Sequence, residues 1–150
     1  MFPETAIPAD PARQHYAVYP RRFYIDQLRT CWDCARPFLF FAREQRYWFE
    51  TLRFFVDADA VRCTDCRRAR HATAAALRRY SAAMTQASLS DDALLAAVED
   101  AAALAEAGVL RRLERLGALK NRALRQLGER AAIERLEQQI TRLREDKEAT

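Results

Sequence analysis

Cys31-Trp-Asp-Cys34 and Cys63-Thr-Asp-Cys66 are two Cys-x-x-Cys pairs separated by 28 residues. A two-residue gap lets one tight turn present both sulfur atoms to the same ion, and two such turns supply the four ligands of a tetrahedral zinc site. We therefore predict a structural zinc ion bound by Cys31, Cys34, Cys63 and Cys66. Iron with the same ligands and reduced cysteines without a metal are the alternatives.

The sequence offers little support for catalysis. A thioredoxin-like Cys-x-x-Cys pair needs a βαβ setting, which neither pair has. Catalytic zinc keeps an open coordination position, whereas four cysteines fill the coordination shell. His71 lies one helical turn beyond Cys66 and fits a solvent-facing residue better than a ligand, and His15 carries no readable signal. We therefore expect a protein that is not an enzyme, with no catalytic or cofactor-binding residues and no small-molecule substrate.

The residues around the cysteines resemble a known family. The stretch from about residue 24 to 68 is similar to the bacterial probable zinc-ribbon family of treble-clef type, and the motifs that carry the resemblance are Cys31-x-x-Cys34, Phe38-x-Phe40, Glu44-Gln45, Tyr47-Trp48-Phe49 and Arg62-Cys63-x-x-Cys66-Arg67. The resemblance implies a zinc knuckle followed by a helix that carries the last two ligands, and it implies little about activity. Members often have a Gly shortly after the aromatic run and a Pro before the second pair, and this chain has neither.

The residue classes are distributed unevenly along the 150 residues. All but one of the 15 aromatic residues lie before residue 60, whereas Ala, Leu, Arg and Glu dominate beyond residue 68. We predict an α+β fold with an irregular N-terminal leader (1–14), a small treble-clef zinc-binding head (15–70) and a mostly α-helical tail (71–150). A head of roughly 60 residues buries only about 60% of its unfolded surface, so we expect most of its aromatic rings to face inward rather than to form a stacking platform for nucleic acid.

Local patterns in the head predict short extended segments and one helix. We expect β-favouring segments over 16–25, a strand at Phe38–Phe41, a short helix from Phe41 to Leu52 and a second β-like run at Phe54–Val56. Glu44 and Gln45 are expected to hold the knuckle, by accepting backbone N–H bonds or by binding an arginine.

Helical spacing dominates the tail. We predict helices at about 64–84, 91–107 and 109–148, with breaks at Gly117 and Gly128, and N-caps at Thr64 and Ser90. The last segment is amphipathic and basic. Packing against the Leu94–Ala105 stripe and docking on a partner helix or nucleic acid both remain open.

Charge is segregated along the chain, although the net charge is only +4. The formal charge sums to zero over residues 1–60, to +5 over 61–80, to −5 over 81–110 and to +4 over 111–150. The basic blocks could bind phosphates, or the acidic block between them could satisfy them internally. Arg36, Arg62 and Arg67 are expected to offset the charge of the zinc thiolates.

These observations point to a binding protein. No apolar run reaches the roughly 18 residues that span a bilayer, and residues 1–20 do not form a signal peptide, so we expect a cytoplasmic protein with no membrane partner. Its expected function is that of a structural zinc-binding interaction or adaptor protein whose helical tail binds a protein partner or self-associates. The alternative is a nucleic-acid-binding protein that uses the Arg67–Arg79 helix and the basic tail face.

Overall fold

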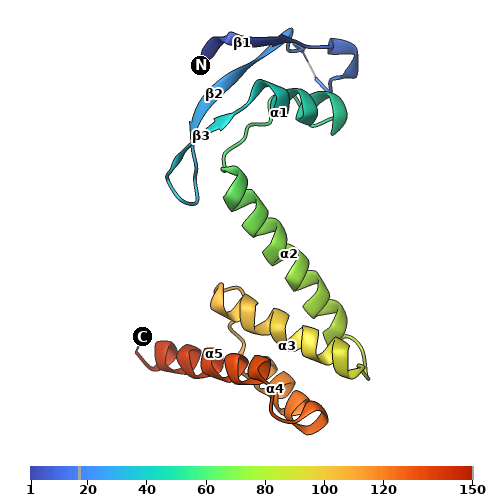
Figure 1. The fold of residues 1–150 in the computed structure, drawn as a ribbon, viewed down its shortest axis with the longest axis vertical. Coiled ribbons are helices and arrows are strands. Elements are labelled where there is room, and N and C mark those ends of the chain that lie inside the picture. Colours follow the sequence, from blue (N-terminus) through green and yellow to red (C-terminus); the bar gives the residue numbers. More distant parts are fainter. Residues whose placement is uncertain (17, 150) are drawn as a thin grey trace. The chain divides into compact units, whose positions relative to one another are not determined.

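The computed structural model describes residues 1–16 and 18–149. Contacts divide the chain into two compact units, the N-terminal unit Met1–Ala69 and the helical unit Arg70–Thr150 (Figure 1). In the described residues, no helix combines the length and the apolar character that crossing a bilayer requires.

A three-stranded antiparallel sheet organises the described part of the N-terminal unit. Its strands are β1 (Phe2–Pro8), β2 (Phe23–Thr30) and β3 (Pro37–Phe40), in the order β1-β2-β3. β2 and β3 pair from Thr30 opposite Pro37 to Gln27 opposite Phe40. The loop that joins these two strands therefore carries the first cysteine pair.

The prediction of an irregular leader over residues 1–14 was wrong. β1 pairs with β2, and the register shifts between Phe2 and Ile7. Within this irregularity the hydroxyl of Thr5 accepts the backbone N–H of Asp26 at 2.8 Å. A short 3₁₀ helix, η1 (Pro11–Arg13), follows. Pairing with a strand far along the sequence orders the segment, so its own weak periodicity could not reveal it.

A short helix covers one face of the sheet (Figure 1). α1 (Ala42–Arg46) continues into a π-helical turn, η2 (Tyr47–Thr51), in which the N–H of Leu52 donates to the carbonyl of Tyr47 at 3.0 Å. This helix agrees with the one predicted from Phe41 to Leu52. It places Phe49, which is fully buried, in a stacked contact with Tyr24 of β2.

The predicted β-like run at Phe54–Val56 is not a strand. It contributes one isolated parallel bridge, between His15 and Phe55. Arg53, just before this run, has a φ of +58°, a left-handed conformation that L side chains adopt at a cost. This residue lies shortly after the aromatic run, where the family often has a Gly.

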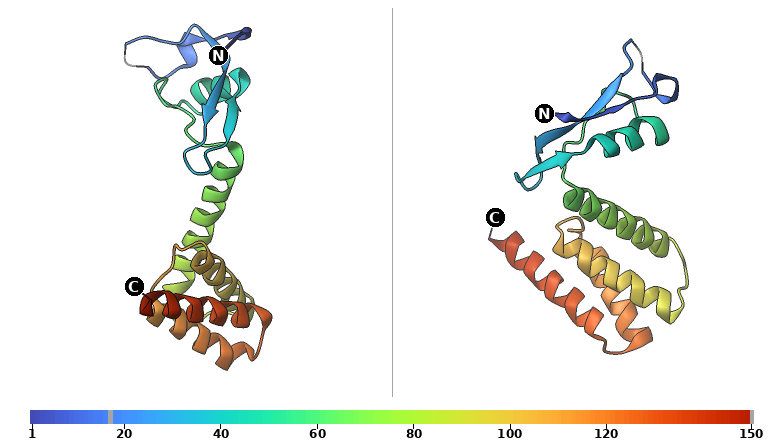
Figure 2. Two further views of the ribbon diagram at one scale, coloured as in Figure 1. Left: turned by 90° about the vertical axis from the view of Figure 1, so that its left-hand side faces the viewer. Right: turned by 45° about the horizontal axis from the view of Figure 1, so that its top comes forward.

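The described part of the helical unit is a set of helices packed around α3 (Asp91–Glu106). α2 (Thr64–Met84) begins in the N-terminal unit and ends in this one, and α4 (Leu113–Leu127) and α5 (Ala131–Glu148) pack against α3 and against each other (Figure 2). Buried side chains from all four helices form one core.

This core settles how the amphipathic tail uses its apolar stripe. Leu116, Leu136 and Ile140 are at most 3% exposed and pack in the core that Leu94 and Val98 share. The stripe therefore serves packing inside the unit. Two acidic residues of α3 also pair with basic residues of this unit, Asp100 with Arg79 and Glu106 with Arg135.

The helix ends follow local sequence signals. Ser90 caps α3 by accepting the N–H of Ala93 at 3.3 Å, as predicted. Thr64 begins α2 rather than capping it, and the carbonyl of Cys63 accepts the N–H of Arg67. Gly128 ends α4, but the predicted break at Gly117 does not occur, because Gly117 lies inside α4.

Candidate metal site

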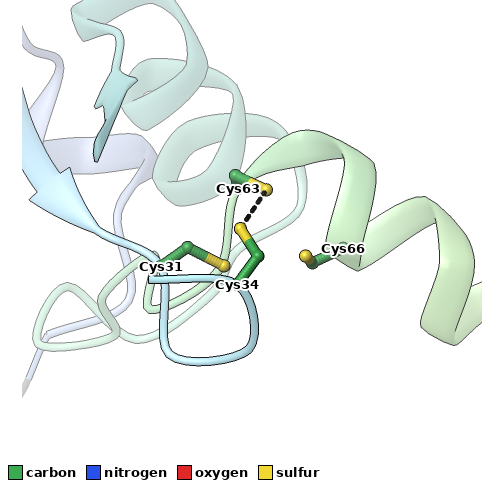
Figure 3. Close-up of side chains that lie close together, drawn as sticks. All are labelled: Cys31, Cys34, Cys63 and Cys66. Carbon is green, nitrogen blue, oxygen red and sulfur yellow. Dashed lines mark hydrogen bonds between the residues drawn. The ribbon is translucent and has the colours of Figure 1, made fainter. Parts of the chain in front are cut away.

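The four cysteines meet at one point of the N-terminal unit. Cys31 and Cys34 lie in the loop between β2 and β3, Cys63 directly precedes α2, and Cys66 lies in its first turn (Figure 3). Their sulfur atoms all lie within 4.8 Å of one another. The sequence prediction that the two distant pairs come together is thus matched by the structure.

The spacing of the sulfur atoms fits a metal ion rather than a disulfide. All four cysteines are free thiols, and the Sγ atoms of Cys34 and Cys63 are 3.9 Å apart. A tetrahedral site with metal–sulfur bonds of about 2.3 Å has sulfur–sulfur edges of about 3.8 Å. The residues present therefore fit a four-coordinate ion with little movement.

Backbone hydrogen bonds hold the two cysteine turns in place. The N–H of Cys31 donates to the carbonyl of Arg36, and the N–H of Ala35 donates to the carbonyl of Cys31, both at 2.9 Å. Ala35 has a φ of +57°, which lets the chain reverse directly after Cys34. The N–H of Trp32 donates to the carbonyl of Val61 at 2.9 Å and so joins the first turn to the segment before the second pair.

The local electrostatics favour thiolates at the first pair and disfavour one at Cys66. Burial opposes ionisation of Cys31, but the backbone N–H groups of Cys63, Cys34 and Asp33 outweigh it and lower the pKa of Cys31 to about 6. The side chain of Arg36 lowers the pKa of Cys34. Hydrogen bonding to Cys63, together with burial, raises the pKa of Cys66 to about 12. A bound cation would favour the thiolate of Cys66 despite this raised pKa, since a cysteine is deprotonated when it binds a metal.

The three arginines expected beside the thiolates take different roles. Arg36 faces the sulfur of Cys34, as predicted. Arg62 instead donates to both carboxylate oxygens of Asp33, at 2.9 and 3.0 Å. This ion pair joins Asp33, inside the first cysteine pair, to the residue directly before the second pair. Arg67 pairs with Glu44 at 2.5 Å and lies over the ring of Trp48.

Glu44 and Gln45 have the structural role that the sequence predicts, by partly different contacts. Glu44 binds an arginine, as expected. Gln45 is fully buried and donates through Nε2 to the carbonyls of Ile25 and Phe40, at 2.6 and 2.9 Å. It therefore acts as a donor that ties α1 to β2 and β3, rather than as an acceptor of backbone N–H bonds.

Comparison with protein families identifies the segment that holds this site. Residues 25–74 match a family model described as "Probable treble clef domain". The match confirms the resemblance drawn from the motifs over residues 24–68, and it includes all four cysteines. Comparisons with curated proteins and with solved structures find no match.

Neither histidine belongs to the cysteine cluster of the treble clef domain. In the described residues, the group positioned to hold a metal consists of the four cysteines. His71 is exposed on α2, as expected, and His15 packs edge-on against Phe55 with ring centroids 5.3 Å apart. Neither therefore competes for a coordination position.

The expectation that most aromatic rings face inward was wrong. Tyr24, Phe40 and Phe49 are buried. The exposed rings are Phe2, Tyr16, Tyr19, Phe23, Trp32, Phe41, Tyr47, Phe54 and Phe55. These nine are a majority of the 14 aromatic residues before residue 60. A unit this small has too little interior for so many rings, and the surplus lies on its surface.

Proposed function

We propose that this protein is a cytoplasmic structural zinc protein that acts as a protein-interaction module and not as an enzyme. The observation that carries the proposal is the convergence of four cysteine sulfurs within 4.8 Å of one another. Four thiolates suit zinc or iron, and zinc is the ion that such closed structural sites ordinarily hold. Because the four ligands fill the coordination shell, no position is left for a substrate. Reducing cytoplasm keeps the thiols available to the metal.

Exposed apolar side chains beside the metal site support the interaction role. Leu28 is 58% exposed and Phe41 is 50% exposed, and they line a groove of about 490 Å³ together with Leu39 and Cys63. Trp32, within the first cysteine turn, is 74% exposed. Exposed apolar side chains that line a groove, as Leu28 and Phe41 do, are typical of a contact site for another protein.

The proposed contact surface lies on the treble clef domain, whereas the sequence led us to expect it on the helical tail. The apolar stripe of the tail is used in its own core, which leaves mainly charged residues outward there. Partner binding or self-association by the helical unit would have to use those charged faces. Replacing one exposed apolar residue in each unit by a charged one tests which unit binds the partner.

Metal analysis and affinity capture test the proposal. The purified chain is expected to contain one zinc ion per molecule, and stoichiometric iron would instead support the iron alternative. Capture from a nuclease-treated native lysate should retain a protein partner with the wild-type chain and lose it with Leu28→Glu. Val109→Glu, which places the same charge on an exposed residue of the helical unit, should keep the partner. Loss with Val109→Glu alone would return the contact to the tail.

Nucleic-acid binding through the Arg67–Arg79 helix is the alternative function. Arg67 is engaged by Glu44, and Arg79 donates to both carboxylate oxygens of Asp100, at 2.6 and 2.9 Å. Two of the arginines in that segment are therefore committed to internal pairs. Binding by the remaining ones would weaken steeply between low and physiological salt, whereas an apolar protein contact would not.

A further inference from the structure

Three arginines of the N-terminal unit gather around one small cavity. Arg13 of η1 and Arg43 and Arg46 of α1 line a cavity of about 380 Å³ together with Tyr47, Glu50 and Thr51. We call these six residues the arginine pocket. Its volume lies within the roughly 300–1,000 Å³ typical of small-ligand sites. The second cysteine pair and the Arg67–Arg79 helix contribute nothing to it.

The carboxylates of this region are engaged elsewhere. Glu50 is 8% exposed and accepts the N–H of Asp10 at 2.9 Å. Asp10 accepts the N–H of Ala12 at 3.0 Å, as the cap of η1. Glu44, the acidic residue of α1, pairs with Arg67. Each nearby acid thus has a partner other than the pocket arginines.

The pocket therefore holds a surplus of positive charge. In residues 1–16 and 18–149, the side chains of Arg13, Arg43 and Arg46 make no ion pair or hydrogen bond. Three guanidinium groups and one buried carboxylate leave a net formal charge of +2. Like charges held together repel one another, and an anion bound between them would relieve this.

The backbone places these groups on one side of the helix. Arg43, Arg46 and Tyr47 are three and four residues apart and so share a helix face. The π-helical turn that follows adds Thr51 to the same cavity, and such turns recur at functional sites. The hydroxyl of Thr51 is a further donor for an anion.

We propose that the arginine pocket binds the phosphate group of a nucleotide, either free or within a single strand. Guanidinium groups match phosphate oxygens with paired N–H donors. The ring of Tyr47, which is 53% exposed, lies beside the cavity and offers a face on which a base can stack. This site is separate from the metal site and from the proposed protein contact.

Binding measurements on the zinc-loaded full chain test the proposal. The probes are inorganic phosphate, adenosine monophosphate and a labelled ten-nucleotide oligouridine, with binding followed by fluorescence anisotropy and by competition. The double variant Arg43→Gln with Arg46→Gln should weaken binding by on the order of tenfold or more. For the oligonucleotide, the slope of log affinity against log salt should become shallower by about 0.7 for each phosphate that the variant no longer neutralises.

Control variants distinguish binding at the arginine pocket from general attraction of the probes to basic residues elsewhere. Arg68→Gln with Arg70→Gln removes the same charge from exposed residues of α2 and should leave binding unchanged. Tyr47→Leu should weaken the nucleotide and oligonucleotide but not inorganic phosphate. Tighter binding of the oligonucleotide than of the mononucleotide would assign the phosphate to a strand, and the reverse would assign it to a free nucleotide. Equal losses in both double variants, a loss only in the α2 variant, or no binding of any probe would overturn the proposal.

Discussion

At the scale of single residues, the metal site depends on neighbours that hold its two halves together. Asp33, inside the first cysteine pair, forms an ion pair with Arg62, directly before the second pair, and the N–H of Trp32 donates to the carbonyl of Val61. These contacts join segments that are far apart in the sequence. These contacts of the fold therefore help to bring the sulfur atoms together.

Tyr24 gives the N-terminal unit a distinct dependence on pH. Burial and the neighbouring Glu50 carboxylate raise its pKa to about 12, although a hydrogen bond from Gln14 acts in the opposite direction. The unfolded value is about 10. Between pH 10 and 12 the unfolded chain releases this proton while the folded chain retains it. The stabilising contribution is thus complete below pH 10 and is lost as the pH rises toward 12.

Denaturant unfolding followed by tryptophan fluorescence measures this effect, because both tryptophans lie in the N-terminal unit. The free energy of unfolding should fall by at most about 1.4 kcal/mol per pH unit from Tyr24. Tyr24→Phe should remove that slope, whereas Tyr47→Phe, at an exposed tyrosine, should leave it. An unchanged slope in Tyr24→Phe would contradict the assignment.

Only some residues of the candidate sites can be predicted from the sequence. The spacing of the cysteines identifies the ligands, because two-residue gaps encode a local turn. It cannot assign Arg62 to Asp33 or Arg67 to Glu44, since those pairs join segments that meet only in the folded chain. The arginine pocket has no local signature either, because Arg13 reaches it from a different element than Arg43.

At the scale of elements, predictions succeed where the signal is local. Ser90 and Gly128 mark helix ends by their own chemistry, and both ends appear in the structure. β1 was missed because its order comes from pairing with β2. The run at Phe54–Val56 has strand-like composition, but it makes only an isolated bridge. Strand formation requires a partner, which periodicity does not specify.

Gly117, inside α4, and Gly128, which caps its C-terminal end, should respond in opposite ways to substitution by alanine. A Cβ atom at Gly117 would meet no atom within 4 Å, and the residue is helical, so Gly117→Ala should stabilise the helical unit by about 1 kcal/mol. Gly128 has φ 69° and ψ −162°, a conformation that only glycine adopts readily. Gly128→Ala should therefore destabilise by about 1–3 kcal/mol. Thermal unfolding followed by circular dichroism at 222 nm should show the midpoint rising in one variant and falling in the other.

At the scale of the whole molecule, the two units draw stability from different sources. The helical unit has a core of 15 buried residues to which α2, α3, α4 and α5 all contribute. The largest such cluster in the described part of the N-terminal unit holds three, namely Tyr24, Ala42 and Phe49. A small core needs an additional constraint, and four cysteines positioned for a metal can provide it. The units should therefore differ in their dependence on the metal.

Replacing one ligand tests that difference directly. Cys63→Ser should abolish stoichiometric zinc and the cooperative tryptophan-fluorescence transition, because structural zinc supplies about 10 to 16 kcal/mol of apparent binding free energy in small domains. The helical unit contains no cysteine, so most of the signal at 222 nm and its thermal transition should persist. Thr64→Ser, beside the ligand, should keep both transitions and the metal. If Cys63→Ser retained zinc, the ligand set would be wrong. If both signals disappeared together, the two units would fold as one cooperative structure.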